Sequence, residues 1–261
     1  MKKIIFSVIC MMTLFVSSCS DMLDVETSRE VELPSIGQAS DSLFYVLGIM
    51  QAVQQAADAY YIQNEMRGDL VDVTVHSDLN LREMANFSAT ASNKYDSAYV
   101  YYRIINNCNY YIANRDTTLY DGTYNVTQSE YATVLAFRAW AYLQLARNYG
   151  KVKPLTSLSD IENDKSEELG IKEIVARLAD EGNTALRRYS GLDLPYGNGV
   201  IGSDYIRSMC IPVDVILGEL YLEAGRYAEA ADYYFKYLLK YKMVASDQRS
   251  PVELSNMWDL N

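Results

Sequence analysis

Apolar residues recur at steps of three and four along most of the chain after residue 38, which is the spacing that gathers them on one face of an α-helix. No segment shows a strong alternation of apolar and polar residues, the pattern of a half-buried strand. The sequence therefore predicts an all-α protein. Six helices are expected, over residues 39–66, 96–114, 127–149, 171–189, 212–224 and 227–241.

Several residues mark the expected helix ends. Thr127 and Glu130 have the spacing of a capping box, in which each side chain bonds a backbone amide that the helix leaves unpaired. Gly150 stands where a left-handed residue ends a helix, and Gly225 separates the last two helices. Residues 67–93, between the first two helices, are rich in Gly, Asp, Asn and Ser. We expect them to form a long loop, a feature that is often functional.

The first residues of the chain have a different character. Lys2 and Lys3 precede an apolar run over residues 4–16, which is too short for a membrane-spanning helix and is typical of a secretory signal. The run ends in Val16-Ser17-Ser18-Cys19. This tetrapeptide resembles a bacterial lipobox, in which the cysteine thiol accepts a diacylglycerol. An ordinary signal peptide with an accidental cysteine is the alternative.

These features divide the chain into three parts. We expect a lipoprotein signal peptide at 1–18, an acylated tether at 19–37 that begins with the lipidated Cys19, and a helical domain at 38–261. Cys108 and Cys210, the two cysteines outside the signal and the anchor, are both expected to lie in helices, where we expect buried free thiols.

Composition narrows the range of functions. The chain has 34 acidic against 23 basic residues, a formal net charge of −11, which argues against nucleic-acid binding because that needs clustered Lys and Arg. His76 is the only histidine, nothing around it supplies a nucleophile, and no residues have the spacing of zinc ligands. We therefore expect no catalytic residue, no metal and no cofactor, and we predict a binding protein and not an enzyme.

The last two predicted helices carry the strongest internal motif, which has the spacing of a tetratricopeptide repeat. In such a hairpin small residues let the helices cross closely, tyrosines fill the wedge between them, and a glycine makes the turn. Ala139 and Tyr142 have the same spacing as Gly218 and Tyr221, which hints at an earlier, divergent repeat. A helical hairpin with chance small residues is the alternative. The motif consists of Leu217, Gly218, Tyr221, Gly225, Tyr227, Ala230 and Tyr234.

Three segments resemble the SusD/RagB family of outer-membrane lipoproteins. Residues 136–152 resemble its signature, an Ala-x-Arg-Ala-x-x-Tyr helix that ends in Tyr-Gly and an extended exit. Residues 64–69 are similar to the Arg-Gly-Asp that follows the family's first helix, and residues 102–109 to its Tyr-x-x-Ile-x-x-x-Asn helix. Family members are usually much longer, and the C-terminal half that contributes much of their ligand surface has no counterpart in this chain.

The resemblance implies a function at the cell surface. Such proteins are lipid-anchored in the outer membrane, bind oligosaccharides or in some members peptides, and partner a SusC-type TonB-dependent transporter, on which the repeat face docks. The family places part of its sugar site in the region of residues 67–99. The candidate ligand-binding residues are therefore Asp72, Asp78, Asn80, Arg82, Tyr95 and Tyr99.

Two alternatives remain open at this point. For each candidate residue taken alone, a solvated loop charge or a packed tyrosine is the commoner explanation. For the whole chain, the alternatives are a tetratricopeptide adaptor lipoprotein that binds another protein and no glycan, and a truncated family member without ligand binding.

Overall fold

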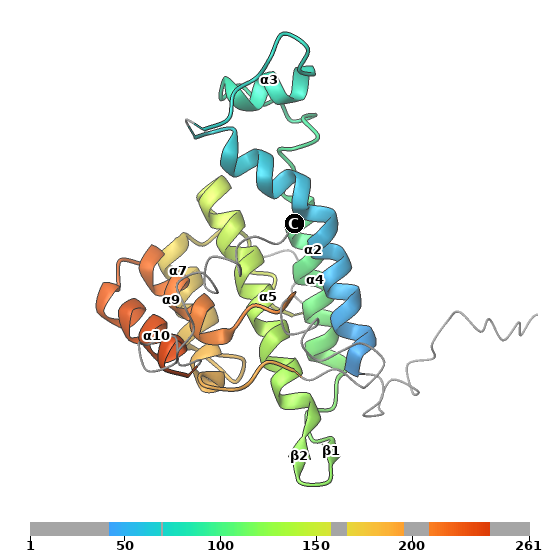
Figure 1. Cartoon of the computed structure of the whole chain (residues 1–261), viewed down its shortest axis with the longest axis vertical. Helices are drawn as coiled ribbons and strands as arrows, with labels where there is room; N and C mark the ends of the chain where they lie inside the picture. Colours follow the sequence, from blue (N-terminus) through green and yellow to red (C-terminus); the bar gives the residue numbers. More distant parts are fainter. Residues whose placement is uncertain (1–41, 69, 158–165, 196–208, 241–261) are drawn as a thin grey trace, which may run out of the picture. The chain divides into compact units, whose positions relative to one another are not determined.

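A computed structural model describes residues 42–240, apart from residues 69, 158–165 and 196–208 (Figure 1). The predicted signal peptide, Cys19 and the tether lie outside the described residues. The described chain is helical, as predicted, with one pair of two-residue strands. Its elements are α2 (Ser42–Glu65), α3 (Leu79–Ala85), α4 (Tyr99–Asn114), β1 (Tyr120–Asp121), β2 (Tyr124–Asn125), α5 (Val126–Tyr149), α7 (Ile171–Val175), the π-helical turn η3 (Ala176–Asp180), the 3-10 turn η4 (Leu186–Tyr189), α9 (Val213–Glu223) and α10 (Tyr227–Lys240).

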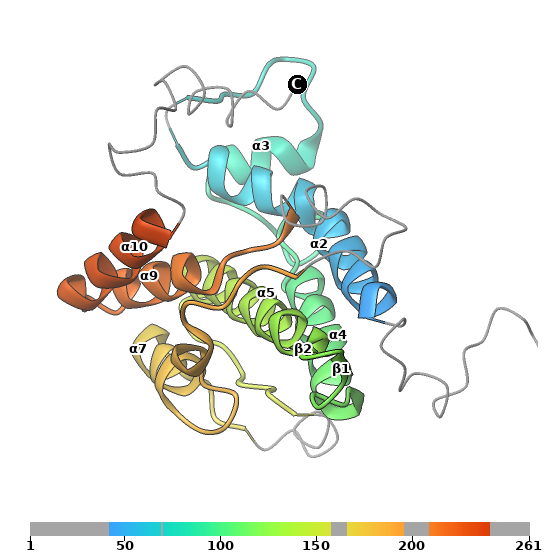
Figure 2. The ribbon, with the colours of Figure 1, turned by 60° about the horizontal axis from the view of Figure 1, so that its bottom comes forward.

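Helix α5 lies at the centre of the core. It packs against α2 and α4 on one side and against α9 and α7 on the other (Figure 2). All of residues 131–146 are buried except the partly exposed Trp140, so α5 is covered around its whole circumference. Ala136, Ala139 and Ala141 are fully buried, and their small side chains let the neighbouring helices approach closely. Tyr142, one turn after Ala139, is also fully buried.

Helices α9 and α10 form a hairpin that turns at Gly225, whose φ of 77° is the left-handed conformation that glycine adopts at no steric cost. Gly218 lies against the ring of Tyr234, since a Cβ at Gly218 would be 2.6 Å from Tyr234 Cε1. Tyr221 and Ala230 are both buried in this hairpin. Gly218 is thus in close contact with α10, and Gly225 makes the turn between the two helices.

Salt bridges attach the hairpin to the central helix. Arg147 on α5 donates to Glu223 and to Glu219 of α9, each at 2.7 Å. Glu219 also accepts from the Tyr234 hydroxyl at 2.7 Å. Although burial opposes ionisation of Glu219, the hydrogen bonds from Tyr234 and Arg147 lower its pKa overall. The ring of Tyr234 is therefore fixed at both its edge and its hydroxyl.

The single helix predicted for residues 171–189 was wrong. The chain follows α7 and the π-helical turn η3, breaks at residues 181–185, and resumes as the short turn η4. Gly182 has a φ of 74°, which no right-handed helix accommodates. Gly182, Asn183 and Thr184 are also weak helix formers, and their effect on the backbone outweighs the apolar spacing.

The start of α5 also differs from the prediction. Asn125 is the N-cap, and its side chain accepts from the amides of Thr127 and Gln128. Glu130 does not close a capping box, because it is buried beside Arg115, with 3.6 Å between Glu130 Oε1 and Arg115 Nε. Asn125, two residues before Thr127, competes successfully for the free amides because asparagine is a strong N-cap residue.

The two cysteines of the domain are buried free thiols, as predicted. Cys108 lies on α4, but Cys210 lies at a bend before α9 and not in a helix. Burial raises the pKa of each thiol to about 12. Neither has the lowered pKa and the exposure that a reactive cysteine needs.

Candidate functional site

The segment between α2 and α4, residues 66–98, contains the short helix α3 and is not a plain loop as predicted. We call residues 70–95 of this segment the excursion. Asp78 begins α3 as its N-cap, with Oδ1 accepting from the amide of Leu81 at 2.9 Å. The pattern Asp78-Leu79-Asn80-Leu81 carries this N-cap signal in the sequence, which the loop-like composition around it obscured.

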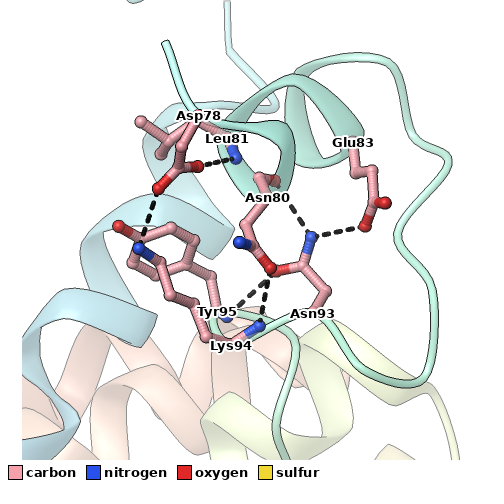
Figure 3. A network of polar contacts seen from close by, with 7 residues as sticks. All are labelled: Asp78, Asn80, Leu81, Glu83, Asn93, Lys94 and Tyr95. Atoms are coloured by element: carbon pink, nitrogen blue, oxygen red, sulfur yellow. Dashed lines mark hydrogen bonds and ion pairs between the residues drawn. The ribbon is translucent and has the colours of Figure 1, made fainter.

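Asn93 is the hub of a polar network that holds the excursion together (Figure 3). Its Nδ2 donates to the carbonyl of Asn80 and to Oε2 of Glu83, both at 2.9 Å. Its Oδ1 accepts from the amide of Tyr95 at 3.0 Å. Asn80 Oδ1 in turn accepts from the amide of Lys94 at 3.2 Å. These bonds tie residues 93–95, the return segment, to α3 through one asparagine that is only 3% exposed.

Charge adds a second link between α3 and the return segment. Lys94 Nζ lies 2.8 Å from Asp78 Oδ2 and 4.7 Å from the centre of the Tyr95 ring (Figure 3). The hydrogen bond from Lys94 lowers the pKa of Asp78, and the bond from Asn93 lowers the pKa of Glu83. Since Lys94 and Asp78 are exposed, their ion pair stabilises only weakly, and the network depends on the sum of its bonds.

Gln63, a fully buried residue of α2, fixes the base of the excursion. Its Nε2 donates to the carbonyl of Tyr95 at 2.8 Å and to the hydroxyl of Tyr149 at 3.0 Å, and its Oε1 accepts from Tyr101 at 2.8 Å. Burial is the main cause that raises the pKa of Tyr101. One buried amide thus joins α2, α4, α5 and the excursion.

The structure brings three of the six predicted ligand residues together. Asp78, Asn80 and Tyr95 all belong to the network around Asn93 (Figure 3). Their polar groups hold the excursion itself, so the structural explanation of these residues is sufficient without a ligand.

The other three predicted residues lie outside the network. Arg82 donates to the carbonyl of Val75, and Asp72 Oδ1 accepts from the amide of Val73 at 2.7 Å. Tyr99, the first residue of α4, has 68% of its surface exposed. Of the six, Tyr99 is the side chain that offers a free ring to solvent.

Sequence reasoning identified Tyr99 but missed the other exposed apolar side chains of this region. It otherwise selected mainly polar residues, although isolated apolar residues in a polar segment were the available signal. Phe87 is 74% exposed and has a φ of 53°, and it is the one non-glycine residue with positive φ in the part of the chain that the structure describes. A bulky residue in this conformation is strained, and strain of this kind occurs often at binding sites. The exposed apolar residues here are Leu70, Val71, Val75, Leu79, Phe87 and Tyr99.

A ladder of aromatic rings lies near the C-terminal end of α2. The ring of Trp140 is 6.2 Å from that of Tyr101 and 5.4 Å from that of Tyr60, which is 5.8 Å from Tyr61. Tyr101 is fully buried, whereas Tyr61 is 63% exposed. Tyr61 therefore lies outside the buried face of α2. The buried face consists of Ile49, Ala52, Ala56, Ala59 and Gln63.

The described residues contain no group of three or more metal-ligating side chains, and His76 is exposed. Within the same residues, no helix has the length and apolar character needed to cross a membrane. Comparison of the chain with protein-family models, with curated proteins and with solved structures gives no match.

Proposed function

We propose that the protein is a lipid-anchored outer-membrane protein of the SusD/RagB type, exposed at the cell surface, which binds oligomeric nutrients, glycans rather than peptides, and partners a SusC-type TonB-dependent transporter. The proposal of glycan binding rests on the exposed aromatic rings around the excursion. Phe87, Tyr99 and Tyr61 present apolar faces to solvent, and pyranose rings stack on such faces through their own apolar C–H faces.

The stiffness of the site supports the same proposal. Binding costs less conformational entropy when the binding groups are held before the ligand arrives. Asn93 and Gln63 hold the excursion through hydrogen bonds to four different segments. An exposed ring beside such a network is better positioned for stacking than one on an unrestrained loop.

The scaffold belongs to the proposal as well. We propose that α9 and α10 are a tetratricopeptide-like repeat and that α5 carries a divergent earlier one. The contact of Gly218 with Tyr234, the turn at Gly225 and the buried Ala230 support the first. The buried Ala139 and Tyr142 support the second. The repeat face is the proposed docking surface for the transporter.

The anchor is tested by acylation. The lipobox-like tetrapeptide at residues 16–19 makes Cys19 the acceptor. Metabolic labelling with an alkyne fatty acid should label the wild type and Cys10→Ala, and should leave Cys19→Ala unlabelled. Equal label in wild type and Cys19→Ala would contradict lipidation at this cysteine.

Ligand binding is tested by calorimetry with a panel of neutral oligosaccharides. Tyr99→Ala should weaken the binding of a stacked sugar by about five- to tenfold, because a ring contact is worth about 1 kcal/mol. Tyr227→Ala is the matched control, since Tyr227 on α10 is 69% exposed and Tyr99 is 68% exposed. Equal affinity in both variants, or no binding of any glycan, contradicts the proposal.

The exposed aliphatic residues favour a second candidate, an adaptor lipoprotein that binds another protein. Leu70 and Val75 are 93% and 83% exposed, and aliphatic side chains suit a protein partner better than a sugar. Cross-linking in outer membranes separates the candidates. Capture of a TonB-dependent barrel favours the transporter partner, and a gene for such a barrel beside this one would agree. Capture of a different protein, without glycan binding, favours the adaptor.

A further inference from the structure

Arg138, on the central helix α5, is a buried cation with an unusual set of partners. It is 2% exposed, and a charge so far from water normally pairs with an anion because desolvation is costly. Among the described residues it bonds only neutral oxygens. Its Nη1 donates to Asn109 Oδ1 and to the carbonyl of Thr156, each at 3.1 Å.

The other edge of the guanidinium has no partner among the described residues. Arg138 Nε is buried and makes no hydrogen bond there, and the contacts found for this side chain all come from Nη1. The edge formed by Nε and Nη2 is the fork with which arginine binds a carboxylate in two parallel hydrogen bonds. Asn109, which donates to the carbonyl of Leu155 at 2.6 Å, holds the opposite edge in place.

Arg138 lines a pocket of about 330 Å³, which we call the Arg138 pocket. This volume lies at the lower end of the range for small-molecule sites. The break in the predicted helix 171–189 shapes one wall, because Glu181, Gly182 and Thr184 all come from it. Arg177, from the π-helical turn η3, lines the pocket too, and such turns occur often at functional sites.

The charges of the lining favour a ligand with a single negative charge. Arg138 and Arg177 carry two positive charges and Glu181 one negative charge, so the lining sums to +1 at neutral pH. Burial lowers the pKa of Arg138, and repulsion from Arg177 acts in the same direction. An anion between the two arginines would oppose both effects.

We infer that the Arg138 pocket binds a small carboxylate through the unpartnered edge of Arg138, with Arg177 as the second cation. A monoanion matches the net charge of the lining better than a phosphate dianion. The inference is independent of the proposed glycan surface, since it uses none of the residues of the excursion. The carboxylate can come from a sugar acid or from an amino acid or peptide, and both share the planar group that the arginine fork fits.

Calorimetry on the folded chain tests the site with sodium glucuronate and sodium glutamate as probes and glucose as the neutral control. At least one carboxylate should bind and glucose should not. Glucuronate binding alone assigns a sugar acid, and glutamate binding alone assigns an amino-acid carboxylate. Either result supports the site. Binding of glucose as tight as that of glucuronate, or no binding of either carboxylate, overturns it.

Variants locate the binding. Arg177→Gln should weaken carboxylate binding by about tenfold, because a hydrogen bond to a charged group is worth about 1.5 kcal/mol. Arg188→Gln removes an exposed arginine outside the pocket lining and should change little. An equal loss in the two variants means general attraction of anions and overturns the site. Arg138→Lys keeps the charge but loses the fork, and it should abolish binding; if it fails to fold, the Arg177 and Arg188 pair still decides.

A carboxylate from the chain itself is the remaining rival occupant. Asp160, Glu162 and Asp164 lie outside the described residues. If carboxylates bind only after all three are replaced by amides, the chain supplies the anion and the proposal is overturned. If the wild type binds and the triple variant binds equally well, the pocket is open to an external ligand as proposed.

Discussion

In the α9–α10 hairpin a glycine lies against a tyrosine ring with no room for a methyl group, whereas the excursion between α2 and α4 has little apolar packing. Of its described residues only Met84 and Asn93 are buried. The excursion is instead held by the bonds of Asn93 and Lys94 (Figure 3) and by the bond of Gln63 to Tyr95. One region is therefore specified by the shapes of its side chains and the other by polar partners.

Both regions expose apolar side chains, but to different degrees. On the hairpin, Tyr227 is 69% exposed, and Leu222, Phe235, Leu238 and Leu239 are 41–55% exposed. An excursion that is held by hydrogen bonds leaves its apolar residues free, and Leu70, Val75 and Phe87 are each more than 70% exposed. Exposed apolar side chains on a fixed backbone are typical of interaction sites.

The largest effect is expected at the closest packing contact of the hairpin, between Gly218 and Tyr234. Gly218→Leu should lower the free energy of unfolding by about 2–3 kcal/mol. The ring of Tyr234 cannot move aside cheaply because its hydroxyl is bonded to Glu219, so the added side chain must displace α10. Chemical denaturation followed by circular dichroism measures the change.

Gly48→Ala is the control for that substitution. Gly48 lies in α2 with nothing within 4 Å of the position of a Cβ, so alanine there should be neutral or stabilise by about 0.5–1 kcal/mol. If both variants destabilise equally, the contact between Gly218 and Tyr234 does not determine the hairpin geometry.

A smaller effect is expected at the point where the two kinds of region meet. Gln63→Met keeps the volume but removes the partners of Tyr95, Tyr101 and Tyr149, and should lower the free energy of unfolding by about 2 kcal/mol. Hydrogen exchange should also quicken in the excursion and remain slow in α9 and α10. Gln54→Met, on the exposed side of α2, should change neither. Uniform loss of protection across both regions would contradict a local role for Gln63.

The hairpin could be predicted from the sequence because its determinants are close together in the chain. Gly218, Gly225 and Ala230 lie within thirteen positions, and small residues and a glycine turn have direct structural meaning. The helix ends were harder, because candidate caps compete. Asn125 and not Thr127 caps α5, and the difference depends on which side chain reaches the free amides.

The excursion could not be predicted to the same degree because its partners are distant in sequence. The bond between Gln63 and Tyr149 spans 86 positions and that between Gln63 and Tyr95 spans 32. No local sequence pattern predicts that a glutamine on a helix is fully buried. Asp78, Asn80 and Tyr95 contact one network, and these contacts could be identified only in the structure. The Arg138 pocket could not be predicted either, because one of its walls comes from the unpredicted helix break at residues 181–185.

A still smaller and strictly local effect is expected at the start of α3. Asp78→Ala removes both the N-cap bond to Leu81 and the ion pair with Lys94. Exchange of the Leu81 amide should become about three- to tenfold faster, without a change in the midpoint of global unfolding. Asp78→Asn retains a capping oxygen but loses the charge, so Leu81 should stay protected. Equal exchange rates in the alanine and asparagine variants would mean that the charge, and not the cap, holds this end of α3.

The smallest effect is the pH dependence of the same network. The pKa of Asp78 is lowered from its ordinary 3.8, first by the hydrogen bond from Lys94, and that of Glu83 from 4.5, first by the bond from Asn93. A carboxyl group whose pKa is lower in the folded state stabilises that state fully above its unfolded pKa, and this stabilisation is lost as the pH falls through the folded pKa. The excursion should therefore loosen below about pH 4, which carboxyl carbon NMR shifts would follow group by group. Lys94→Met removes the donor to Asp78 and leaves Asn93 in place, so the pKa of Asp78 should rise toward 3.8 while that of Glu83 stays low. If both pKa values rise together, the network is coupled through the backbone, and the two carboxylates are not held by separate donors.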